Sequence, residues 1–461
     1  MKKNYTLIFM AMGLFLGNGF AQSAAECPAN LSIFAEYAKV KNYDAAYTPW
    51  MEVRTNCPEL NAATYVYGER ILSHKIKNAT DNTPFVEDLL TLYDEWLTYF
   101  PADRAGKSQK GKILASKAQA MLDYGVASKM EVYHVFDTAY TSDAESFTNP
   151  KALYSYFKTL YESYKAGVAS VSMELLFSKY EDVSEKFAYE NTKLSKTLDV
   201  IIKKEDAGQP LTSRDKKSKR VCEINSRANT TFANNLDAII AKEASCENLI
   251  PLYRNNLDAN RADEKWLKRA AGRMDSKDCS DDPLFVELVE ALHSLKPSAD
   301  SAYYLGILKD KAGDTQAALA FYEESLSLET DPYRKASIYY KIAVKFKNRG
   351  LKSQARKYSQ QALNNQPSMG KAYILIASLY ADSANDCGNT QFEKRAVYWL
   401  AAQTARRAAS VDPSLKSTAQ KLEASYNGRA PSKTDIFTEG RAGEVITFDC
   451  WIRSKVTVPN L

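Results

Sequence analysis

Few residues of this chain have types and spacings that could perform catalysis. Its histidines are His74, His134 and His293. Three imidazoles so far apart in the sequence provide little material for a zinc site, and none has a neighbour of the kind that activates a nucleophile. The chain contains no GxSxG, HExxH or GxxxxGKS/T motif, and no GxGxxG motif after a strand. We therefore expect no catalytic, cofactor-binding or metal-binding residues, and the chain is predicted not to be an enzyme.

One cluster of aspartates has the acidic character of a calcium-binding loop. The segment from Asp275 to Asp282 contains four aspartates. It lacks the central glycine and the terminal glutamate of a calcium-binding loop. We therefore expect a solvated loop in which Asp281 or Asp282 caps the following helix.

Cysteines offer the other chemistry of this chain, and their spacing predicts disulfides. Seven are present: Cys27, Cys57, Cys222, Cys246, Cys279, Cys387 and Cys450. The first two are 30 residues apart, and Cys246 and Cys279 are 33 apart, which fits a helix, a turn and a second helix. The two ends of an antiparallel helix pair lie side by side, so a disulfide of this span can close there. We predict both disulfides, with Cys387 and Cys450 as a weaker third pair that leaves Cys222 unpaired.

The first 25 residues have the layout of a secretory signal peptide. Two lysines precede an apolar run at 7–16, and small residues follow at 21–25. We expect cleavage between about Gln22 and Glu26 and export to a periplasm, where disulfides form. The apolar run is too short to span a bilayer, and no later stretch reaches the roughly twenty residues required. A lipid anchor on Cys27 is the weaker alternative, because Glu26 stands where lipoprotein signals carry a small residue.

The composition indicates a large and mostly helical globular protein. Of the 461 residues, 45% are hydrophobic and 25% are charged, as is typical of globular chains. Glycine and proline number only 18 and 15, too few for turn-rich sandwiches or propellers. The formal net charge of +5 is small for this length and gives no reason to expect nucleic acid as a partner.

The last third of the chain repeats itself. Three units follow one another between Ala299 and Pro413, and the third has about a dozen extra residues around 382–393. The recurring residues are Ala302, Leu305, Gly306, Ala318, Tyr322 and Leu326 in the first unit and Tyr339, Ile342, Ala343, Ala355, Tyr358 and Ala362 in the second. Spacings of three and four place them on one face of each helix. Gly313 and Gly350 permit the turn between the two helices of a unit.

This pattern resembles the tetratricopeptide repeat, a family of stacked helix-turn-helix units of about 34 residues. The match covers roughly 299–413, although Lys309 and Ser359 depart from the usual residue types. The same design is visible at the N-terminus between Phe34 and Pro58. The resemblance implies a solenoid in which neighbouring helix pairs cover one another's apolar sides and leave a curved surface for a partner.

Two longer helices are expected in the middle of the chain. Apolar residues close to heptad spacing extend over 168–204, and a second helical pattern follows over 211–243. A turn at 208–210 separates them, so we predict a long antiparallel hairpin. The hairpin could project from the solenoid or bury its apolar seam against neighbouring repeats, and the sequence favours neither.

Positive charge is concentrated just after the turn of this hairpin. The residues are Arg214, Lys216, Lys217, Lys219 and Arg220. Cations near a helix N-terminus are unfavourable, because the helix dipole there prefers anions. The cluster could contact acidic lipid, an anionic polymer or an acidic protein, but a solvated helix face explains it most simply.

The C-terminal end is expected to be extended rather than helical. Residues 444–452 and 455–458 are rich in β-branched and aromatic residues, which is typical of two short strands. We expect this ribbon to cap the last repeat, with Trp451 in its core. Addition to a partner's sheet, with Trp451 as an interface anchor, is the alternative.

The predicted fold is therefore all-α: a solenoid of stacked helical hairpins similar to tetratricopeptide repeat proteins, with a long helical hairpin in the middle and a short C-terminal β-ribbon. The expected segments are a signal peptide (1–25), degenerate N-terminal helical repeats (26–167), the long hairpin (168–245), a helical hairpin braced by Cys246 and Cys279 (246–298), the tetratricopeptide repeats (299–427) and the tail (428–461).

The resemblance implies a non-enzymatic scaffold that binds a protein partner in the bacterial envelope, as an accessory subunit of an assembly or secretion complex associated with the outer membrane. Candidate partner-binding residues are Tyr303, Lys309, Lys341, Lys345, Tyr373, Tyr380 and Trp451. The alternatives are a cell-wall or polysaccharide-binding protein or enzyme with an aromatic-lined groove, and a structural spacer. No nucleic acid and no cofactor is expected.

Overall fold

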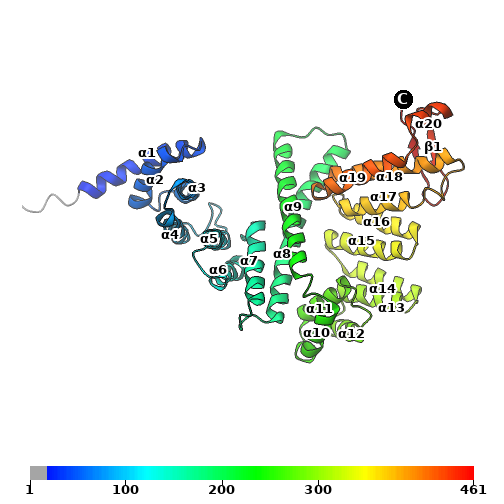
Figure 1. Cartoon of the computed structure of the whole chain (residues 1–461), viewed down its shortest axis with the longest axis horizontal. Coiled ribbons are helices and arrows are strands. Elements are labelled where there is room, and N and C mark those ends of the chain that lie inside the picture. The colour runs from blue at the N-terminus through cyan, green and yellow to red at the C-terminus, as the bar shows by residue number, and fades with distance from the viewer. Residues whose placement is uncertain (1–17) are drawn as a thin grey trace, which may run out of the picture. The chain divides into compact units, whose positions relative to one another are not determined.

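The computed structural model describes the backbone from Asn18 to Leu461 and the side chains from Glu26 onward. The charged start and apolar run of the predicted signal peptide therefore lie outside the described residues. The described chain separates into two units, of which the first ends at Leu176 and the second begins at Phe177. Each unit is built of helices that pack on their neighbours in the sequence (Figure 1).

Helices α1 to α7 form the N-terminal unit. Their bounds are α1 (Asn18–Lys39), α2 (Tyr43–Asn56), α3 (Ala63–Asn78), α4 (Thr83–Tyr99), α5 (Lys110–Tyr124), α6 (Lys129–Asp143) and α7 (Pro150–Lys165). α1 packs on α2, α3 on α4 and α5 on α6, and each pair contacts the next. Trp50 is fully buried, and its indole donates a hydrogen bond to the Thr64 carbonyl at 2.7 Å, because a buried N–H requires an acceptor. The aromatic core thus joins the first two pairs.

The C-terminal unit contains the remaining elements. They are α8 (Met173–Asp206), which begins just before the boundary, α9 (Ser213–Ile240), α10 (Cys246–Asn260), α11 (Glu264–Ser276), α12 (Pro283–Leu295), α13 (Ala299–Lys311), α14 (Thr315–Leu328), α15 (Pro332–Asn348), α16 (Lys352–Asn365), α17 (Gly370–Ala381), α18 (Gln391–Val411), the 3₁₀ turn η1 (Pro413–Leu415), α19 (Lys416–Arg429), α20 (Lys433–Glu439), β1 (Val445–Phe448) and β2 (Ser454–Thr457). Asp282 caps α12 by accepting from the Leu284 amide at 2.9 Å, as expected for the acidic loop.

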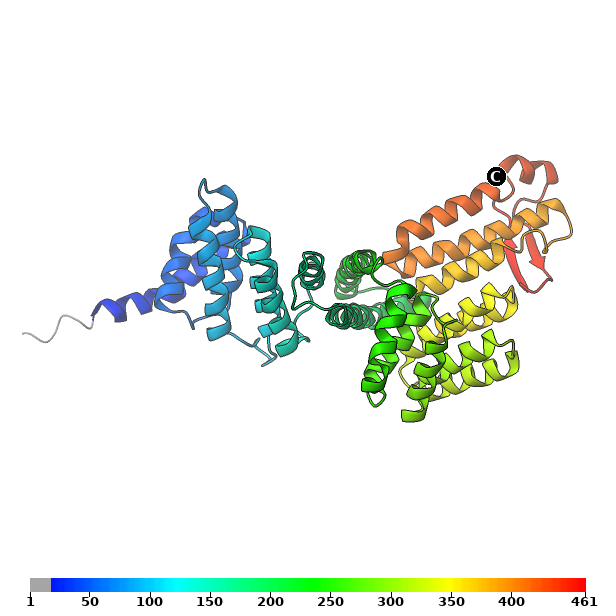
Figure 2. The ribbon, with the colours of Figure 1, turned by 60° about the horizontal axis from the view of Figure 1, so that its bottom comes forward.

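The predicted repeats form stacked helix pairs. α13 packs on α14, α15 on α16 and α17 on α18, and each pair contacts the next (Figure 2). The turns inside the first two pairs pass through Gly313 (φ 80°) and Gly350 (φ 73°), a left-handed conformation that glycine adopts without strain. The extra residues of the third unit form the loop between α17 and α18. The fold class predicted from the sequence is therefore confirmed.

Gly306 shows why small residues recur in these units. A Cβ atom at this position would lie inside van der Waals distance of the Tyr322 ring, which is buried between α13 and α14. We expect Gly306→Ala to lower the free energy of unfolding by about 2 kcal/mol, because extra volume in a packed core forces shifts of the backbone or side chains. Urea unfolding of the full chain checks this value.

Gly428→Ala is the matched control for that variant. Gly428 lies in α19, and nothing is within 4 Å of the Cβ position. Alanine there should be neutral or stabilise the protein by roughly 0.5 kcal/mol through its higher helix propensity. If the two substitutions changed the free energy of unfolding equally, the close contact between Gly306 and Tyr322 would not be the reason for glycine at this position.

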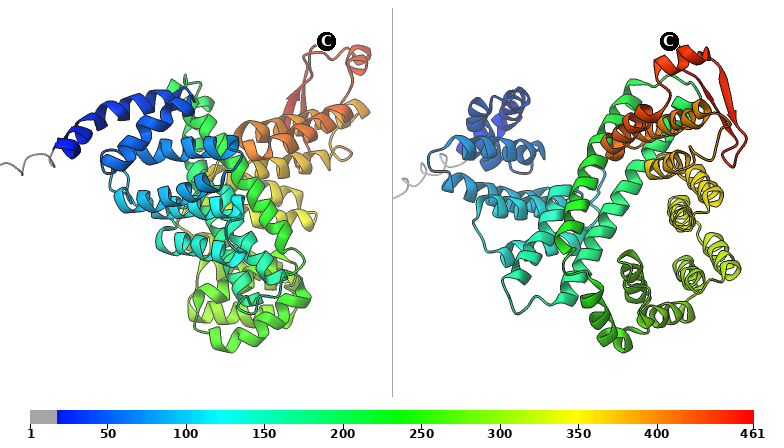
Figure 3. Two further views of the ribbon diagram at one scale, coloured as in Figure 1. Left: turned by 60° about the vertical axis from the view of Figure 1, so that its left-hand side comes forward. Right: turned by 45° about the vertical axis from the view of Figure 1, so that its right-hand side comes forward.

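The long hairpin is present, and it does not project from the repeats. α8 and α9 lie side by side and antiparallel (Figure 3), with the Tyr180 hydroxyl bonded to Asp237 and the Asn229 amide bonded to Asn191. Near the start of α8, Glu181 forms an ion pair with Arg273 of α11. The hairpin is thereby fastened to α11, two helices before the first repeat helix.

Further along α8, Asp199 joins the hairpin to two successive repeats. The side chain is only 4% exposed. Its carboxylate accepts hydrogen bonds from the Tyr333 hydroxyl at the start of α15 and from the Ser368 amide just before α17, both at 2.7 Å. Such a buried carboxylate is tolerated because its oxygens are satisfied. At the end of α8, Asp206 pairs with Arg407 of α18 at 2.7 Å. The second of the two alternatives for the hairpin is thus the one observed.

The C-terminal tail covers the last repeat. β1 and β2 pair antiparallel, with Val445 opposite Thr457 and Phe448 opposite Ser454. The inward residues Ile446, Phe448, Ile452, Val456 and Val458 are buried in one cluster with α17 and α18. Trp451 packs against this cluster and donates to Ser383 Oγ at 3.1 Å. The ribbon is therefore a cap on an apolar helix face.

All three predicted cysteine pairs are bonded in the structure. They are Cys27–Cys57, Cys246–Cys279 and Cys387–Cys450. The first spans α1 and α2, and the second spans α10 and α11, so each closes a pair of helices. The third joins the α17–α18 loop to the β-ribbon. Cys222 is a buried free thiol.

Candidate functional site

The first helices of the repeats form a continuous face. α13, α15 and α17 are the first helices of successive units, and α15 contacts α17 directly. In a stack of such pairs, side chains on the first helices face a shared surface that can receive a partner. Charge and exposure on this face decide what it could bind.

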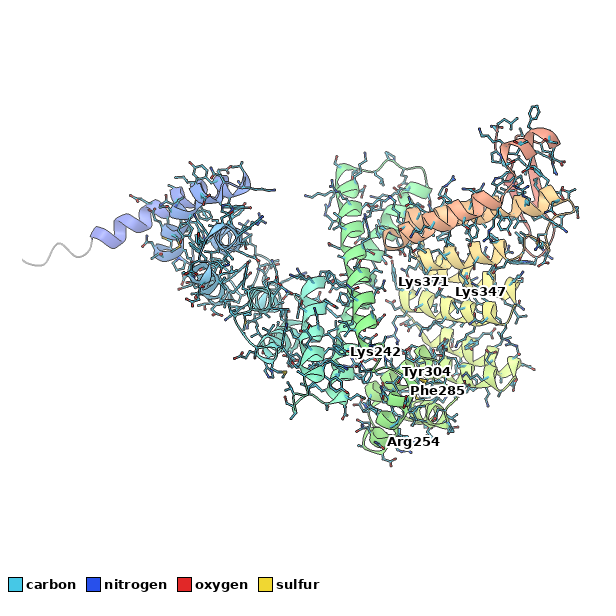
Figure 4. The ribbon with its side chains drawn as sticks, in the orientation of Figure 1. Lys242, Arg254, Phe285, Tyr304, Lys347 and Lys371 are labelled. Atoms are coloured by element: carbon cyan, nitrogen blue, oxygen red, sulfur yellow. A yellow bond between two sulfur atoms is a disulfide. The ribbon has the colours of Figure 1, made fainter. Side chains whose placement is uncertain are left out.

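Two lysines on this face stand over tyrosine rings of the preceding unit. Lys341 Nζ lies 5.0 Å from the centroid of the Tyr303 ring, and Lys371 Nζ lies 4.5 Å from that of Tyr340. The face of an aromatic ring is electronegative and attracts an ammonium group. Both lysine side chains are exposed, whereas Tyr303 is buried. The tyrosines thus orient the ammonium groups, and the lysines present them; we call Lys341 and Lys371 the lysine pair (Figure 4 labels Lys371).

The lysine pair lacks carboxylate partners. Within the described part of the chain, neither ammonium group forms an ion pair with an acidic side chain, although Asp412 lies close enough to favour the charged form of Lys371. The surrounding protein lowers the pKa of Lys371 even though its side chain keeps solvent contact, and the positive charge of Lys341 lowers that pKa further. Two ammonium groups that repel each other are suited to bind an anion.

Neighbouring lysines of α15 have partners. Lys345 Nζ lies 3.4 Å from Asp275 Oδ1 in α11, and Lys347 Nζ donates to Ser378 Oγ at 3.1 Å in α17. These contacts connect α15 to the helices on both of its sides. The lysine pair, by contrast, has no such partner among the described side chains.

The predicted partner-binding residues are not gathered at one surface. Tyr303 is buried and lies beneath Lys341, so its ring supports the ammonium group from below. Lys309 is exposed at the end of α13, and Lys345 is half-buried in its ion pair. Of these four predicted residues, Lys341 alone belongs to the lysine pair.

The remaining predicted residues have structural contacts. Tyr373 packs against the cluster formed by the hairpin and α18. Tyr380 is 7% exposed, and its ring centroid is 6.0 Å from that of Trp451, which packs in the cap. Lys371 was missed, although it lies only two residues before Tyr373. Residues two apart on a helix point to nearly opposite faces, so Tyr373 and Lys371 lie on different sides of α17.

Two of the three histidines contact side chains of a neighbouring helix. His74 Nε2 lies 3.2 Å from Asp44 Oδ2, and His293 Nδ1 lies 3.0 Å from Ser301 Oγ, each between neighbouring helices. Among the described residues, no group of histidine, cysteine, aspartate and glutamate side chains could hold a metal ion. Among the helices that the structure describes, none is both long and apolar enough to cross a membrane.

Comparisons with known proteins identify the family. No protein-family model matches the chain. The photosystem I assembly protein Ycf3 of Cyanophora paradoxa is 33% identical over 115 residues, which cover 23% of this chain and 66% of that protein. Ycf3 of Prochlorococcus marinus (strain MIT 9303) is 30% identical over 144 residues, covering 28% of this chain and 83% of that protein. These relatives are tetratricopeptide repeat proteins. The chain belongs to the tetratricopeptide repeat family.

Two solved structures were also found by comparison, both with low sequence identity and low TM-scores. Yeast Tom70 aligns over 90% of this chain and 83% of its own, with 14% identity and a TM-score of 0.27. A tetratricopeptide repeat protein from Parabacteroides merdae aligns over 69% of this chain and 97% of its own, with 12% identity and a TM-score of 0.24.

Proposed function

We propose that this tetratricopeptide repeat protein is an exported, non-enzymatic scaffold whose lysine pair binds an acidic segment or terminal carboxylate of a protein partner. The observation that supports the proposal is the placement of Lys341 and Lys371 on tyrosine rings without carboxylate partners in the described chain. An ammonium group held in position loses little freedom when it binds, so more of the interaction energy appears as affinity.

The proposed setting is the bacterial envelope, where the protein would act as an accessory subunit of an assembly or secretion complex. The signal-like N-terminus and three disulfides support export, because disulfides persist in oxidising compartments. The names of the relatives, photosystem I assembly proteins, support a role in assembling a complex. A polysaccharide groove is less favoured, since the tyrosines on this face are covered by lysines.

Reversing the charge of the lysine pair is expected to weaken partner binding about 100-fold. Each ammonium group can contribute roughly 1.5 kcal/mol or more through a charge-assisted hydrogen bond, and a carboxylate in its place repels the anion. Partners would be identified by cross-linking the tagged full chain in the native envelope and analysing the captured peptides by mass spectrometry. Calorimetry with the purified partner then compares the wild type with K341E/K371E.

K433E/K455E provides the matched control for charge. Both lysines are exposed on the tail of the same unit, so the net charge changes equally. We expect the control to bind within about threefold of the wild type, because Lys433 lies in α20 and Lys455 in β2, outside the helices that carry the lysine pair. Equal losses in the two variants, or a partner whose cross-links avoid α15 and α17, would contradict the lysine pair as the binding site.

A further inference from the structure

The end of the C-terminal unit that contains the hairpin turn is strongly basic. Residues 203–227 of the hairpin and 406–423 of α18, η1 and α19 together contain twelve Lys and Arg and six Asp and Glu, a net charge of +6. The whole chain has a net charge of only +5. α9 packs on η1, and a depression is lined by both segments, including Arg227 and Lys416. The positive charge of the protein is therefore concentrated on one surface, which we call the basic end.

Internal ion pairs account for only part of this charge. The pairs within the basic end are Lys204–Asp215, Lys219–Glu205, Arg407–Asp206 and Arg406–Glu423. Among the described side chains, the other cations of this end have no acidic partner and are exposed: Lys203, Arg214, Lys216, Lys217, Arg220, Arg227, Lys416 and Lys421. The four pairs fasten helices to one another, and the eight remaining cations are available to an external anion.

Apolar side chains are interspersed with the cations on α9. Thr212 and Asp215 form a capping box that fixes the start of the helix. Arg214, Lys217, Val221 and Ile224 are spaced three and four residues apart, so they form one stripe. Val221 and Ile224 are 47% and 54% exposed although both are large and apolar. The hairpin contact uses a different side of α9, where Cys222 packs with Leu198.

We propose that the basic end docks on an acidic lipid surface, with the stripe of α9 facing the headgroups. A helix face that combines Lys and Arg with exposed aliphatic residues fits the boundary between headgroups and acyl chains, and its cations attract anionic lipid. Nucleic acid is less suited, because residues 203–231 contain no aromatic side chain for base stacking. The inference goes beyond the proposed protein-binding function and does not depend on it.

Vesicle sedimentation with the full chain tests the inference. The probes are phosphatidylcholine vesicles with and without 30 mol% phosphatidylglycerol at about 0.1 M salt. We expect binding to the acidic vesicles only, and a loss of about 100-fold for R214Q/K217Q/R220Q, since each cation near the surface contributes about fivefold. Glutamine preserves helix propensity. V221S/I224S should reduce binding about tenfold without any change in charge.

K77Q/K107Q/K110Q is the matched control, because it removes three exposed cations from the N-terminal unit. This variant should bind as the wild type does. If the control variant lost as much vesicle binding as R214Q/K217Q/R220Q, the inference would be overturned. Equal binding of the wild type to neutral and acidic vesicles would overturn it too. Displacement of the protein from acidic vesicles by 10 mM inorganic phosphate at constant ionic strength would indicate an anion site instead of a lipid surface. Tighter binding to duplex DNA than to the vesicles would indicate nucleic acid. Either result refutes lipid docking. K341E/K371E should retain vesicle binding, which separates this outcome from a failure of the proposed function.

Discussion

Asp199→Ala is expected to destabilise the docking of α8 on the repeats by about 4 kcal/mol. The Asp199 carboxylate accepts from the Tyr333 hydroxyl and the Ser368 amide, and hydrogen bonds to a charged group contribute roughly 1.5–3 kcal/mol each. Alanine also leaves the Ser368 amide buried without its acceptor. Hydrogen–deuterium exchange of the full chain should show faster exchange in α8 and at the start of α17, because local opening becomes more frequent.

Two variants make this experiment specific. Asp206→Ala removes the ion pair with Arg407, whose side chains are 51% and 34% exposed, and should cost less than about 1 kcal/mol. Asp199→Asn retains an acceptor oxygen of similar shape and should have an intermediate effect. If Asp199→Ala accelerates exchange no more than Asp206→Ala does, the hairpin is held by other contacts.

Removing the Cys387–Cys450 disulfide is expected to destabilise the C-terminal cap by about 4 kcal/mol. The bond closes a loop of 63 residues, and the chain-entropy estimate of its stabilisation increases with loop length. A two-stranded ribbon is marginal alone, so its register depends on this bond and on the packing of Phe448 against α17 and α18. In C387S/C450S, amides of β1 and β2 should exchange faster, and proteases should cleave the tail sooner.

C27S/C57S is the control for loss of a disulfide as such. It breaks a helix-pair bond of the N-terminal unit with a sequence separation of 30, so exchange should increase around α1 and α2 and remain unchanged in the ribbon. Unchanged proteolysis of the tail in C387S/C450S would mean that apolar packing alone holds the cap.

The sequence supplied those features of the protein that depend on neighbouring residues. Glycine at Gly306 and Gly313, with large apolar residues three and four positions apart, predicted the helix pairs, because helix periodicity and turn geometry are local. The cysteine spacing predicted the Cys27–Cys57 and Cys246–Cys279 disulfides for the same reason, since a helix pair brings its two ends together. The β-ribbon was also predicted from its β-branched residues, and its observed bounds, Val445–Phe448 and Ser454–Thr457, lie within the expected segments.

The candidate site was predicted only in part. Lys341 was among the residues chosen from the sequence, but Lys371 and the supporting role of the tyrosines were not. Which side chain covers which depends on how one helix pair is placed on the next, and a helical pattern shows only that two residues share a face. Tyr303 therefore looked like a contact residue until the position of Lys341 above its ring was known.

By itself, the sequence determined a helical repeat protein with three disulfides and a capped C-terminal end. Only the tertiary structure decided that the long hairpin lies against the repeats and that the cations near its turn share one surface with those of α18 and α19. The reason is that these arrangements depend on polar contacts between distant residues, such as Asp199 with Tyr333, 134 positions away, and with Ser368, 169 positions away. A buried helix face produces apolar residues at regular spacing, which can be recognised in the sequence. A single hydrogen bond between residues so far apart in the chain leaves no such pattern.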